Sequence, residues 1–427
     1  MLIEFRVENH RSLRDEQVLT MEAGRVGDED DPRPRKVPGH AKKLLTVAAL
    51  YGANASGKSN VLSALAFMRE AVLTSHWLWS PDQAIPRQPF AWGPKSTEAS
   101  MFEVAILIGK TRYQYGFALT DEIVAEEWLN AWPKGKKQTW FERDGDDYKF
   151  SENLKGENQT IKSVTRNNAL FLSTAAQHGH SQLAGVHSWF NDLDFVNLDF
   201  ALRIPGRIPP YYSTPSRSMT RHAGTLRAAA LGQSTPAANP ILEAYIKLLK
   251  GADSGITGLK FVGNVSEDDR FGPIDRNIRL RHQAQIDDAW LPLKEESRGT
   301  RRVFEIARPI LVAVQEGGLL LVDELEASLH PLLAQRLVQL FNDPKTNPKN
   351  AQLIFTTHDT NLLSSTLGEP ALRRDQIWLT EKDQEGATVL YPMTDYKPRK
   401  AESLERGYLL GRYGAIPFLG GLAAYKL

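Results

Sequence analysis

The sequence contains no cysteine, which excludes disulfide bonds, cysteine-ligated zinc, iron–sulfur clusters and thiol catalysis. It also has no stretch that approaches the roughly 20 apolar residues of a membrane-spanning helix. Residues 1–8 alternate between apolar and polar side chains, as a half-buried strand does, and do not form a signal peptide. We therefore expect a cytoplasmic protein that has no membrane partner and is not itself a transporter pore.

The sequence has little excess charge of either sign, since its formal net charge is +1. Overall charge therefore neither indicates nor excludes a nucleic-acid partner, and any basic surface would have to be local. The hydrophobic content of 41% and the charged content of 24% are those of an ordinary soluble globular protein. With 427 residues, the chain is long enough for two or three domains, or for one large domain with insertions.

Among the features that are present, the most informative is a glycine-rich segment with the pattern G-x-x-x-x-G-K-S at residues 52–59. It follows an apolar run and precedes a helical pattern, so a strand, a loop and a helix are expected in that order. The glycines let the backbone wrap closely around a phosphate, while the amides, the lysine and the helix start supply positive charge. The sequence therefore predicts a site for ATP and Mg²⁺ that uses Gly52, Ala55, Ser56, Gly57, Lys58, Ser59 and Asn60.

A second element of phosphate chemistry is the apolar strand 318–322, which ends in Asp323 and Glu324. A strand buried in a parallel sheet has this composition, and ligands of such sheets gather at the carboxyl ends of the strands. Asp323 is suited to hold Mg²⁺, directly or through water, together with the hydroxyl of Ser59. Glu324 is suited to deprotonate the attacking water, and Lys58 is suited to stabilise the phosphates during the reaction.

Two further motifs belong to the same chemistry. The strand 352–357 is followed by His358, which from this position can reach the γ-phosphate. Ser297 and the amide of Gly299 stand at the start of a helical pattern, where they would form an anion site. The simpler alternative for this second motif is an ordinary helix N-cap.

The remaining patterns give the organisation of the chain. Residues 102–150 predict an antiparallel β segment with hairpin turns at 109–110 and 144–145, and residues 24–43 predict a surface loop. Residues 203–222 are rich in proline, serine, arginine and tyrosine, so they form either a solvated loop or a docking surface for a partner or a nucleic acid. We predict an α/β fold whose three parts are an N-terminal part of the ATPase head, a mainly helical insertion with helices near 189–193 and 241–250, and a C-terminal part of the head. Their bounds are 1–150, 151–285 and 286–427.

The order of the motifs resembles the ABC-type ATPase head, which transporter ATPase subunits, SMC and Rad50 proteins, RecF, OLD and bacterial defence ATPases share. The resemblance rests on the phosphate-binding loop and on residues 296–300, 322–324, 326–331 and 357–359. More narrowly, the chain resembles the AAA15/AAA21 (RloA-like) group of abortive-infection ATPases in residues 51–60, 375–378 and 408–417. The resemblance covers both ends of the chain and not its middle.

The resemblance implies that ATP is bound between two subunits. One subunit supplies the phosphate-binding loop, Asp323, Glu324 and His358, and the other supplies Ser297 and Gly299. Because one chain has one copy of each half-site, at least a homodimer with two shared ATP sites is expected. The resemblance further implies a nucleotide contact for Asn54, a metal contact for Gln88, and a place at the subunit interface for Ser328 and Leu329. The chain departs from the family pattern at Arg298 and Glu326, where acidic residues and aspartate are commoner.

Composition separates the members of this superfamily. The chain has neither the heptads nor the cysteines of Rad50-like proteins, and only about 70 residues follow His358, too few for the additional TOPRIM domain of OLD-type nucleases. The leading hypothesis is an oligomeric Mg²⁺-dependent ATPase of an anti-phage (abortive-infection) defence system that controls a separate, TOPRIM-like effector and responds to a phage-derived trigger. The alternatives are a RecF- or SMC-like repair ATPase that binds DNA through Arg203, Arg207, Arg217 and Arg221, and a regulatory scaffold that binds ATP but barely hydrolyses it.

Overall fold

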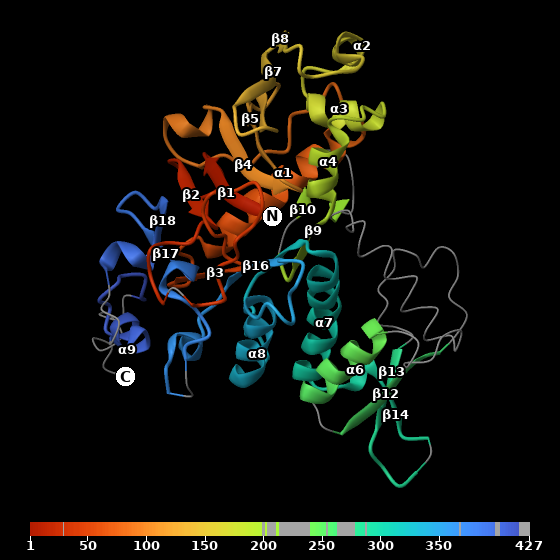
Figure 1. The fold of residues 1–427 in the computed structure, drawn as a ribbon, viewed down its shortest axis with the longest axis vertical. Helices are drawn as coiled ribbons and strands as arrows, with labels where there is room; N and C mark the ends of the chain where they lie inside the picture. Colours follow the sequence, from red (N-terminus) through yellow and green to blue (C-terminus); the bar gives the residue numbers. More distant parts are fainter. Residues whose placement is uncertain are drawn as a thin grey trace.

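A six-stranded sheet forms the centre of the protein (Figure 1). The computed structural model describes residues 1–28, 30–198, 201–202, 211–212, 240–252, 255–262, 278–286, 288–366, 369–397 and 402–417. The strand order is β18-β17-β3-β16-β15-β9, and all neighbouring pairs are parallel except β17 and β18. These strands are β18 (Thr388–Pro392), β17 (Ile377–Lys382), β3 (Val47–Gly52), β16 (Gln352–Thr356), β15 (Leu319–Val322) and β9 (Leu193–Val196).

The central sheet is covered by helices on both faces because its strands are apolar on both sides. Alternate residues of β3, Ala48 and Leu50, belong to the same core as helix α1 (Lys58–Leu78). Val47, Ala49 and Tyr51 face the opposite core, which contains α7 (Arg298–Glu316) and α8 (Pro331–Asn342). Strands buried in this way read as continuous apolar runs, which is why the sequence indicated β3, β15 and β16.

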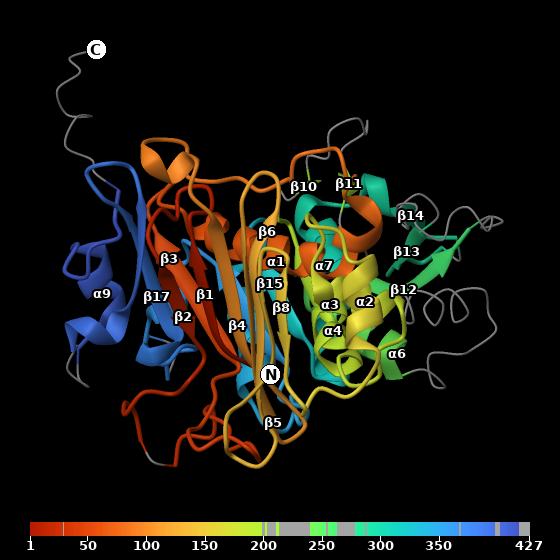
Figure 2. The same ribbon diagram turned by 90° about the horizontal axis from the view of Figure 1, so that it is seen from above.

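A seven-stranded antiparallel sheet packs on the other side of α1, so this helix is buried on nearly its whole circumference. Its strand order is β2-β1-β4-β5-β6-β7-β8, and the hairpin that joins β4 and β5 turns at residues 109–110 as predicted. Figure 2 shows several of these strands side by side, with α2, α3 and α4 gathered beyond the β8 edge. The bounds are β1 (Leu2–Glu8), β2 (Gln17–Thr20), β4 (Ser100–Ile108), β5 (Thr111–Leu119), β6 (Val124–Trp132), β7 (Gln138–Asp144) and β8 (Asp147–Phe150).

The described residues of the insertion contain strands as well as helices. Its helices are α2 (Asn158–Val164), α3 (Phe171–Gln177), α4 (Ala184–Asn191) and α6 (Pro240–Ala252). The helix expected near 189–193 lies earlier, because Leu193 already begins β9 and pairs with Leu319 of β15. Its other strands are β10 (Ala201–Leu202), β11 (Tyr211–Tyr212), β12 (Ile256–Phe261) and β13 (Ile278–His282). β14 (Trp290–Pro292), just beyond the insertion, forms a sheet with β12 and β13 that packs on α6 and α7. Residues 203–210 and 213–222 of the proposed docking segment, with its four arginines, lie outside the described residues.

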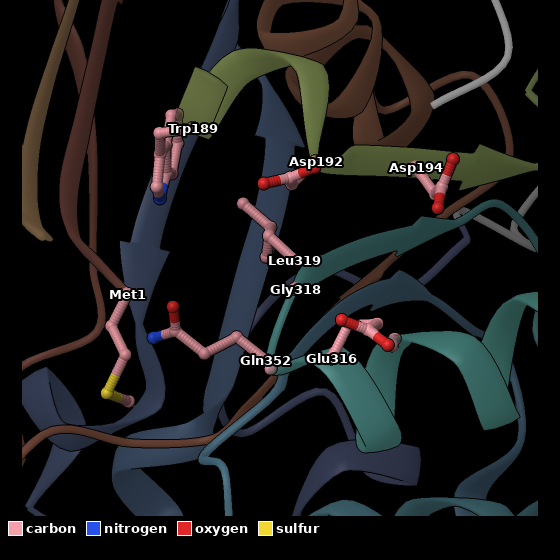
Figure 3. Close-up of a pocket in the computed structure, with 10 residues that line it drawn as sticks. Met1, Trp189, Asp192, Asp194, Glu316, Gly318, Leu319 and Gln352 are labelled. Carbon is pink, nitrogen blue, oxygen red and sulfur yellow. The ribbon is translucent and has the colours of Figure 1, made fainter. Parts of the chain in front are cut away.

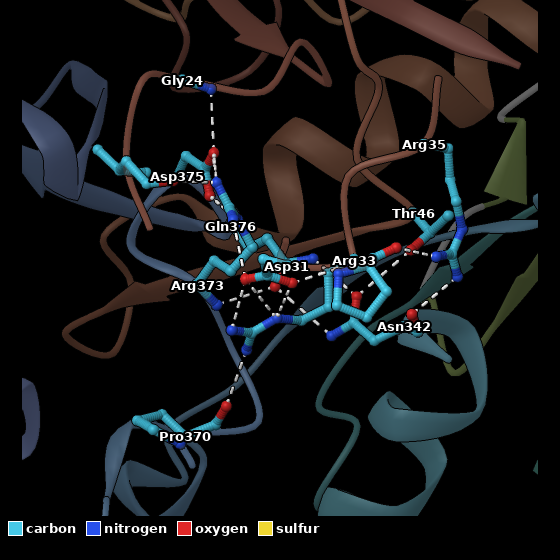
Figure 4. A network of polar contacts seen from close by, with 12 residues as sticks. Gly24, Asp31, Arg33, Arg35, Thr46, Asn342, Pro370, Arg373, Asp375 and Gln376 are labelled. Carbon is cyan, nitrogen blue, oxygen red and sulfur yellow. Dashed lines mark hydrogen bonds and ion pairs between the residues drawn. The ribbon is translucent and has the colours of Figure 1, made fainter. Parts of the chain in front are cut away.

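The segment 24–43, predicted as a surface loop, is anchored to the protein by a polar network (Figure 4). The guanidinium of Arg373 bonds to both Asp31 and Asp375, and Asp375 also accepts a hydrogen bond of 2.9 Å from the amide of Gly24. Burial raises the pKa of Asp31, but hydrogen bonds from Arg33 and Arg373 outweigh this effect and hold the pKa well below its usual range. Asp375 belongs to the 375–378 motif, so this motif fastens the loop to the strand β17.

The motif at residues 408–417 also holds parts of the fold together, since its contacts are with β3 and β17. Helix α9 (Leu404–Leu409) is followed by a segment whose Ala415 amide donates to Glu381 of β17. Tyr408 packs edge to face on Tyr51 of β3, with ring centroids 5.5 Å apart, and its hydroxyl donates to Ala415 O.

The two sheets and the helices between and around them confirm the α/β class predicted from the sequence. None of the helices in the described ranges combines the length and the apolar character needed to span a bilayer.

A cavity of about 190 Å³ opens at the amino ends of β9, β15 and β16 (Figure 3). Its lining includes Met1, Gln352 and three acidic side chains, Asp192, Asp194 and Glu316. Burial lowers the pKa of the Met1 amino group to about 6. Since three carboxylates disfavour a triphosphate, this cavity is a poor nucleotide site, and it lies at the edge of the sheet opposite to Asp323.

Candidate active site

The phosphate-binding loop connects β3 to α1 in the tight form that its glycines permit. Gly57 has a φ of 105°, which disfavours any residue with a side chain. A Cβ atom on Gly52 would lie 2.3 Å from Thr380 Oγ1 and 2.5 Å from Ser56 Oγ. Both glycines are therefore required by the geometry of the loop, while Asn54 and Ala55 at its tip are exposed.

Lys58 lies in the loop with its ammonium group bonded to backbone carbonyls. Its Nζ atom donates to Gly52 O at 2.9 Å and to Ala53 O at 3.0 Å. Burial lowers the pKa of Lys58, although the charges of Asp323, Glu326 and Glu324 oppose this effect. The cation is thus held between the loop and the acidic strand end.

Ser59 and Asp323 meet at the carboxyl edge of the sheet, as the sequence predicted. Ser59 Oγ donates to Asp323 Oδ1 at 2.9 Å, and Thr356 Oγ1 donates to the same oxygen at 2.5 Å. A hydroxyl and a carboxylate beside a phosphate-binding loop are the donor set that Mg²⁺ uses when phosphates and water complete its shell. Among the described residues there is no cluster of three or more acidic or histidine side chains that would hold a metal without phosphate.

Glu324 occupies a strained turn that several donors and acceptors fix. Its φ is 50°, a left-handed conformation that costs a non-glycine residue roughly 1–3 kcal/mol. Its amide donates to Thr356 Oγ1 at 2.8 Å, and its carbonyl lies 3.3 Å from Nη2 of the buried Arg302. The turn leaves Glu324 exposed directly after Asp323, and an exposed carboxylate is able to act as a base toward water.

His358 follows β16, which lies between β3 and β15, so the sheet order places it between the phosphate-binding loop and Glu324. Its amide donates to Glu326 Oε1 at 2.6 Å. Burial and then the charge of Lys58 lower the pKa of His358, against the opposing effect of the three nearby acids. The imidazole is therefore neutral near pH 7 and has one N–H to offer a phosphate oxygen.

Ser297 and Gly299 are placed apart from the phosphate-binding loop. Ser297 is the N-cap of α7, and its Oγ accepts from the amide of Thr300 at 3.1 Å, which is the simpler role considered above. A Cβ on Gly299 would lie 3.1 Å from Ser328 O, so the start of α7 touches the segment that follows Glu324. In the part of the chain that the structure describes, neither residue hydrogen-bonds to residues 52–60.

Gln88 and Asn197 differ in their relation to the acidic pair. Gln88 Oε1 accepts from Arg11 Nε at 2.6 Å, which engages the side chain with the turn after β1. Asn197, directly after β9, donates from Nδ2 to Asp323 O at 3.0 Å. Asn197 reaches Asp323 because β9 pairs with β15 in a register that sets Val196 opposite Val322. The sequence did not indicate this residue, because its only signal is a single asparagine after a four-residue strand. The sequence did not indicate Thr356 or Arg302 either, because neither belongs to a motif and only the folded chain brings them to Asp323 and Glu324.

We expect Thr356→Val to lower the ATP turnover number by roughly 10- to 100-fold, because both acids lose the hydroxyl that orients them. The affinity for ATP should change less, since in the described part of the chain Thr356 is hydrogen-bonded to Asp323 and Glu324 and not to the phosphate-binding loop. Phosphate release and nucleotide titration would measure the two quantities. Thr356→Ser keeps the hydroxyl and should retain most activity, and an equally large loss in both variants would contradict the orienting role.

A glycine-rich loop closed by lysine and serine, with an acidic strand end hydrogen-bonded to that serine, defines a P-loop nucleoside triphosphatase. Residues 47–364 match the model of the family described as "AAA domain, putative AbiEii toxin, Type IV TA system". Because the match spans most of the chain, the protein belongs to this family and carries its ATPase domain. None of the curated proteins compared with the chain matched it.

Several solved structures are similar to the chain at low identity. One is the SMC head domain from Thermotoga maritima, with 12% identity and a TM-score of 0.41 over 92% of this chain and 98% of that chain. Another is an SMC head bound to the C-winged helix domain of ScpA, with 11% identity and a TM-score of 0.42 over 96% and 99%. A third is an Smc head with an extended coiled coil bound to the C-terminal domain of ScpA derived from Pyrococcus furiosus, with 11% identity and a TM-score of 0.42 over 96% and 98%. At these values the likeness carries no argument about function.

Proposed function

We propose that the protein is a Mg²⁺-dependent ATPase that works as a dimer with two shared ATP sites, within an abortive-infection defence system. The observation that carries the proposal is that Ser59 and Asp323 are hydrogen-bonded, while Ser297 and Gly299, at the start of α7 next to Ser328, make no hydrogen bond to the phosphate-binding loop in the described part of the chain. Ser297, Ser328 and Leu332 are all exposed there, so this surface is available to a second copy. The family description, which names a toxin of a toxin–antitoxin system, supports the defence role.

In this proposal the amides of the phosphate-binding loop and Lys58 bind the phosphates, and Ser59 and Asp323 hold the metal. Mg²⁺, when bound, neutralises phosphate charge. Glu324 accepts a proton from the attacking water, and neutral His358 donates a hydrogen bond to the terminal phosphate. Asn197 donates to the backbone carbonyl of Asp323, so it would help to hold the strand end whose carboxylate would bind the metal.

Mixing two inactive variants tests the shared site. Lys58→Ala removes one half-site and Ser297→Arg blocks the other, so each variant alone should be inactive. A heterodimer has one site with both defects and one intact site, and a 1:1 mixture should recover roughly a quarter of the wild-type rate by random assortment. Ser297→Asn preserves the helix cap and controls for loss of folding. A mixture as inactive as its components would refute the shared site.

The effector is proposed to be a separate TOPRIM-like nuclease that the ATPase restrains until a phage-derived signal arrives. Affinity purification of the ATPase with the product of the neighbouring gene tests this relation. Cells carrying both genes should lose protection against phage when Lys58 is changed to Ala. Protection that persists in the variant, without any stable complex, would refute the defence role and leave the ATPase assignment in place.

Nucleic-acid binding is a second candidate function, which the sheet β12–β14 favours. Its three strands contain no acidic residue, and its outer face carries Lys260, Arg279, Arg281 and Trp290. Lys260 pairs directly with Arg279 across the strands, an arrangement of like charges that destabilises a sheet. Lys260 Nζ lies 4.0 Å from the centroid of the Trp290 ring. Cations around an aromatic ring fit a phosphate backbone with stacked bases.

Charge reversal separates this candidate from chance attraction. Arg279→Glu with Arg281→Glu should weaken the binding of a fluorescent oligonucleotide and reduce the slope of log affinity against log salt by about two, one for each phosphate contact. The same charge change at Lys136 and Lys137, exposed in the β6–β7 turn, is the matched control. Equal effects of the two pairs would indicate non-specific attraction, and no binding by the wild type would exclude the candidate.

A further inference from the structure

Three segments that are distant in the sequence join in one line of hydrogen bonds around the phosphate-binding loop. Asn60 Nδ2 donates to Ser12 Oγ at 2.6 Å, and Ser12 Oγ lies 2.7 Å from Thr388 Oγ1. Thr388 Oγ1 in turn donates to the carbonyl of Ser56 at 2.8 Å. The line therefore starts at one end of the loop, passes through the β1–β2 turn and β18, and returns to the middle of the loop.

Only one arrangement of protons satisfies this line. The Ser56 carbonyl can only accept, so it takes the single hydroxyl proton of Thr388. The hydroxyl of Ser12 must then donate to Thr388, and the amide group of Asn60 supplies the proton that Ser12 accepts. All four groups are satisfied in this one direction, which fixes the orientation of the Ser56 carbonyl.

The surroundings make the line rigid. Thr388 is buried, its amide donates to Ser12 O at 2.7 Å, and a Cβ on Gly57 would lie only 2.0 Å from Thr388 Oγ1. The turn that presents Ser12 contains two non-glycine residues with left-handed backbone, Asn9 with a φ of 56° and Arg11 with a φ of 51°. Backbone strain of this kind persists only where the surroundings enforce it, and it clusters at ligand sites. Asn9 enforces it here, since its side chain bonds to the backbone of Phe90, Lys95, Glu98 and Ala99.

Fixing the Ser56 carbonyl also fixes the next amide, because the peptide unit is planar and trans. The Gly57 N–H must point in the direction opposite to the carbonyl, away from β18. We propose that Ser12 and Thr388 are positioning residues for nucleotide binding, which hold the Ser56–Gly57 peptide so that the Gly57 amide is preset to donate to a phosphate. This inference rests on the proposed ATPase function and assigns the preset amide to two residues outside the phosphate-binding motif.

Thr388→Val tests the inference, because valine has the shape of threonine and lacks the hydroxyl. The dissociation constant for ATP, measured by calorimetry, should rise about 10- to 100-fold. Thr388→Ser should restore affinity to within about threefold of the wild type. Thr380→Val is the matched control: it removes a buried hydroxyl that contacts the Ser56 side chain and leaves the Ser56 carbonyl bonded. The melting temperature without nucleotide should fall similarly in both valine variants, with affinity lost mainly in Thr388→Val.

Ser12→Ala gives the same readout at a half-buried position if Thr388→Val does not fold. The double variant Ser12→Ala with Thr388→Val should bind ATP about as weakly as the weaker single variant, because both break one line. Wild-type affinity in Thr388→Val, or losses that multiply in the double variant, would overturn the inference. Failure of the wild type to bind ATP would instead refute the proposed function, so the two failures are distinguishable.

Discussion

Glu324→Gln is expected to lower the ATP turnover number by at least about 100-fold while leaving the affinity for ATP near that of the wild type. Glutamine has the shape of glutamate, so the strained turn and its bonds to Thr356 and Arg302 should persist, but the amide cannot accept the proton of the attacking water. The variant should therefore accumulate as an ATP-bound dimer. Single-turnover phosphate release and light scattering with ATP measure the two effects.

Glu326→Gln is the control for this prediction. It removes the same charge two residues away, and its side-chain oxygen can still accept the His358 amide bond. Its rate should stay within a few-fold of the wild type. Turnover by Glu324→Gln at the wild-type rate would show that another group acts as the base.

Lys58→Ala is expected to weaken ATP binding by about 100-fold or more and to abolish measurable hydrolysis, because the ammonium group is the cation of the phosphate-binding loop. The structure holds this group between Gly52 O, Ala53 O and the acidic strand end. Nucleotide titration followed by fluorescence measures the loss.

Lys110→Ala controls for the loss of one positive charge, since Lys110 is exposed at the turn between β4 and β5. It should bind ATP as the wild type does. If Lys58→Ala retained wild-type affinity, the phosphate contacts assigned to the loop would be wrong, whatever the role of Glu324.

Sequence reasoning located the parts of the site that are local in the chain. The spacing of Gly52, Gly57, Lys58 and Ser59 predicts the phosphate-binding loop, and the apolar run before Asp323 predicts the acidic strand end. The structure brings Ser59 and Asp323 into contact as the order of the motifs implied. Apolar runs indicated β3, β15 and β16, and the hairpin turns after residue 102 indicated the antiparallel strands.

The sequence could not predict the site residues whose position depends on pairing between distant segments of the chain. Asn197 gains its place from the register of β9 on β15, and Thr388 gains its place from the position of β18 beside the loop. The anchoring of residues 24–43 depends on Arg373, more than 300 residues away, so composition alone indicated a surface loop. The metal contact of Gln88 is implied by the family resemblance alone, and the structure engages its side chain with Arg11.

The position of β3 has a consequence for biosynthesis. Both of its neighbours in the sheet, β16 and β17, belong to the last quarter of the chain. A ribosome therefore finishes the glycine-rich loop long before the strands that flank it emerge, and closing such distant contacts makes folding slow. Incomplete chains would leave β3 with two open edges and no ordered loop, so a truncated product cannot engage nucleotide. We therefore expect nucleotide binding to begin only after β16 and β17 have been synthesised and have paired with β3.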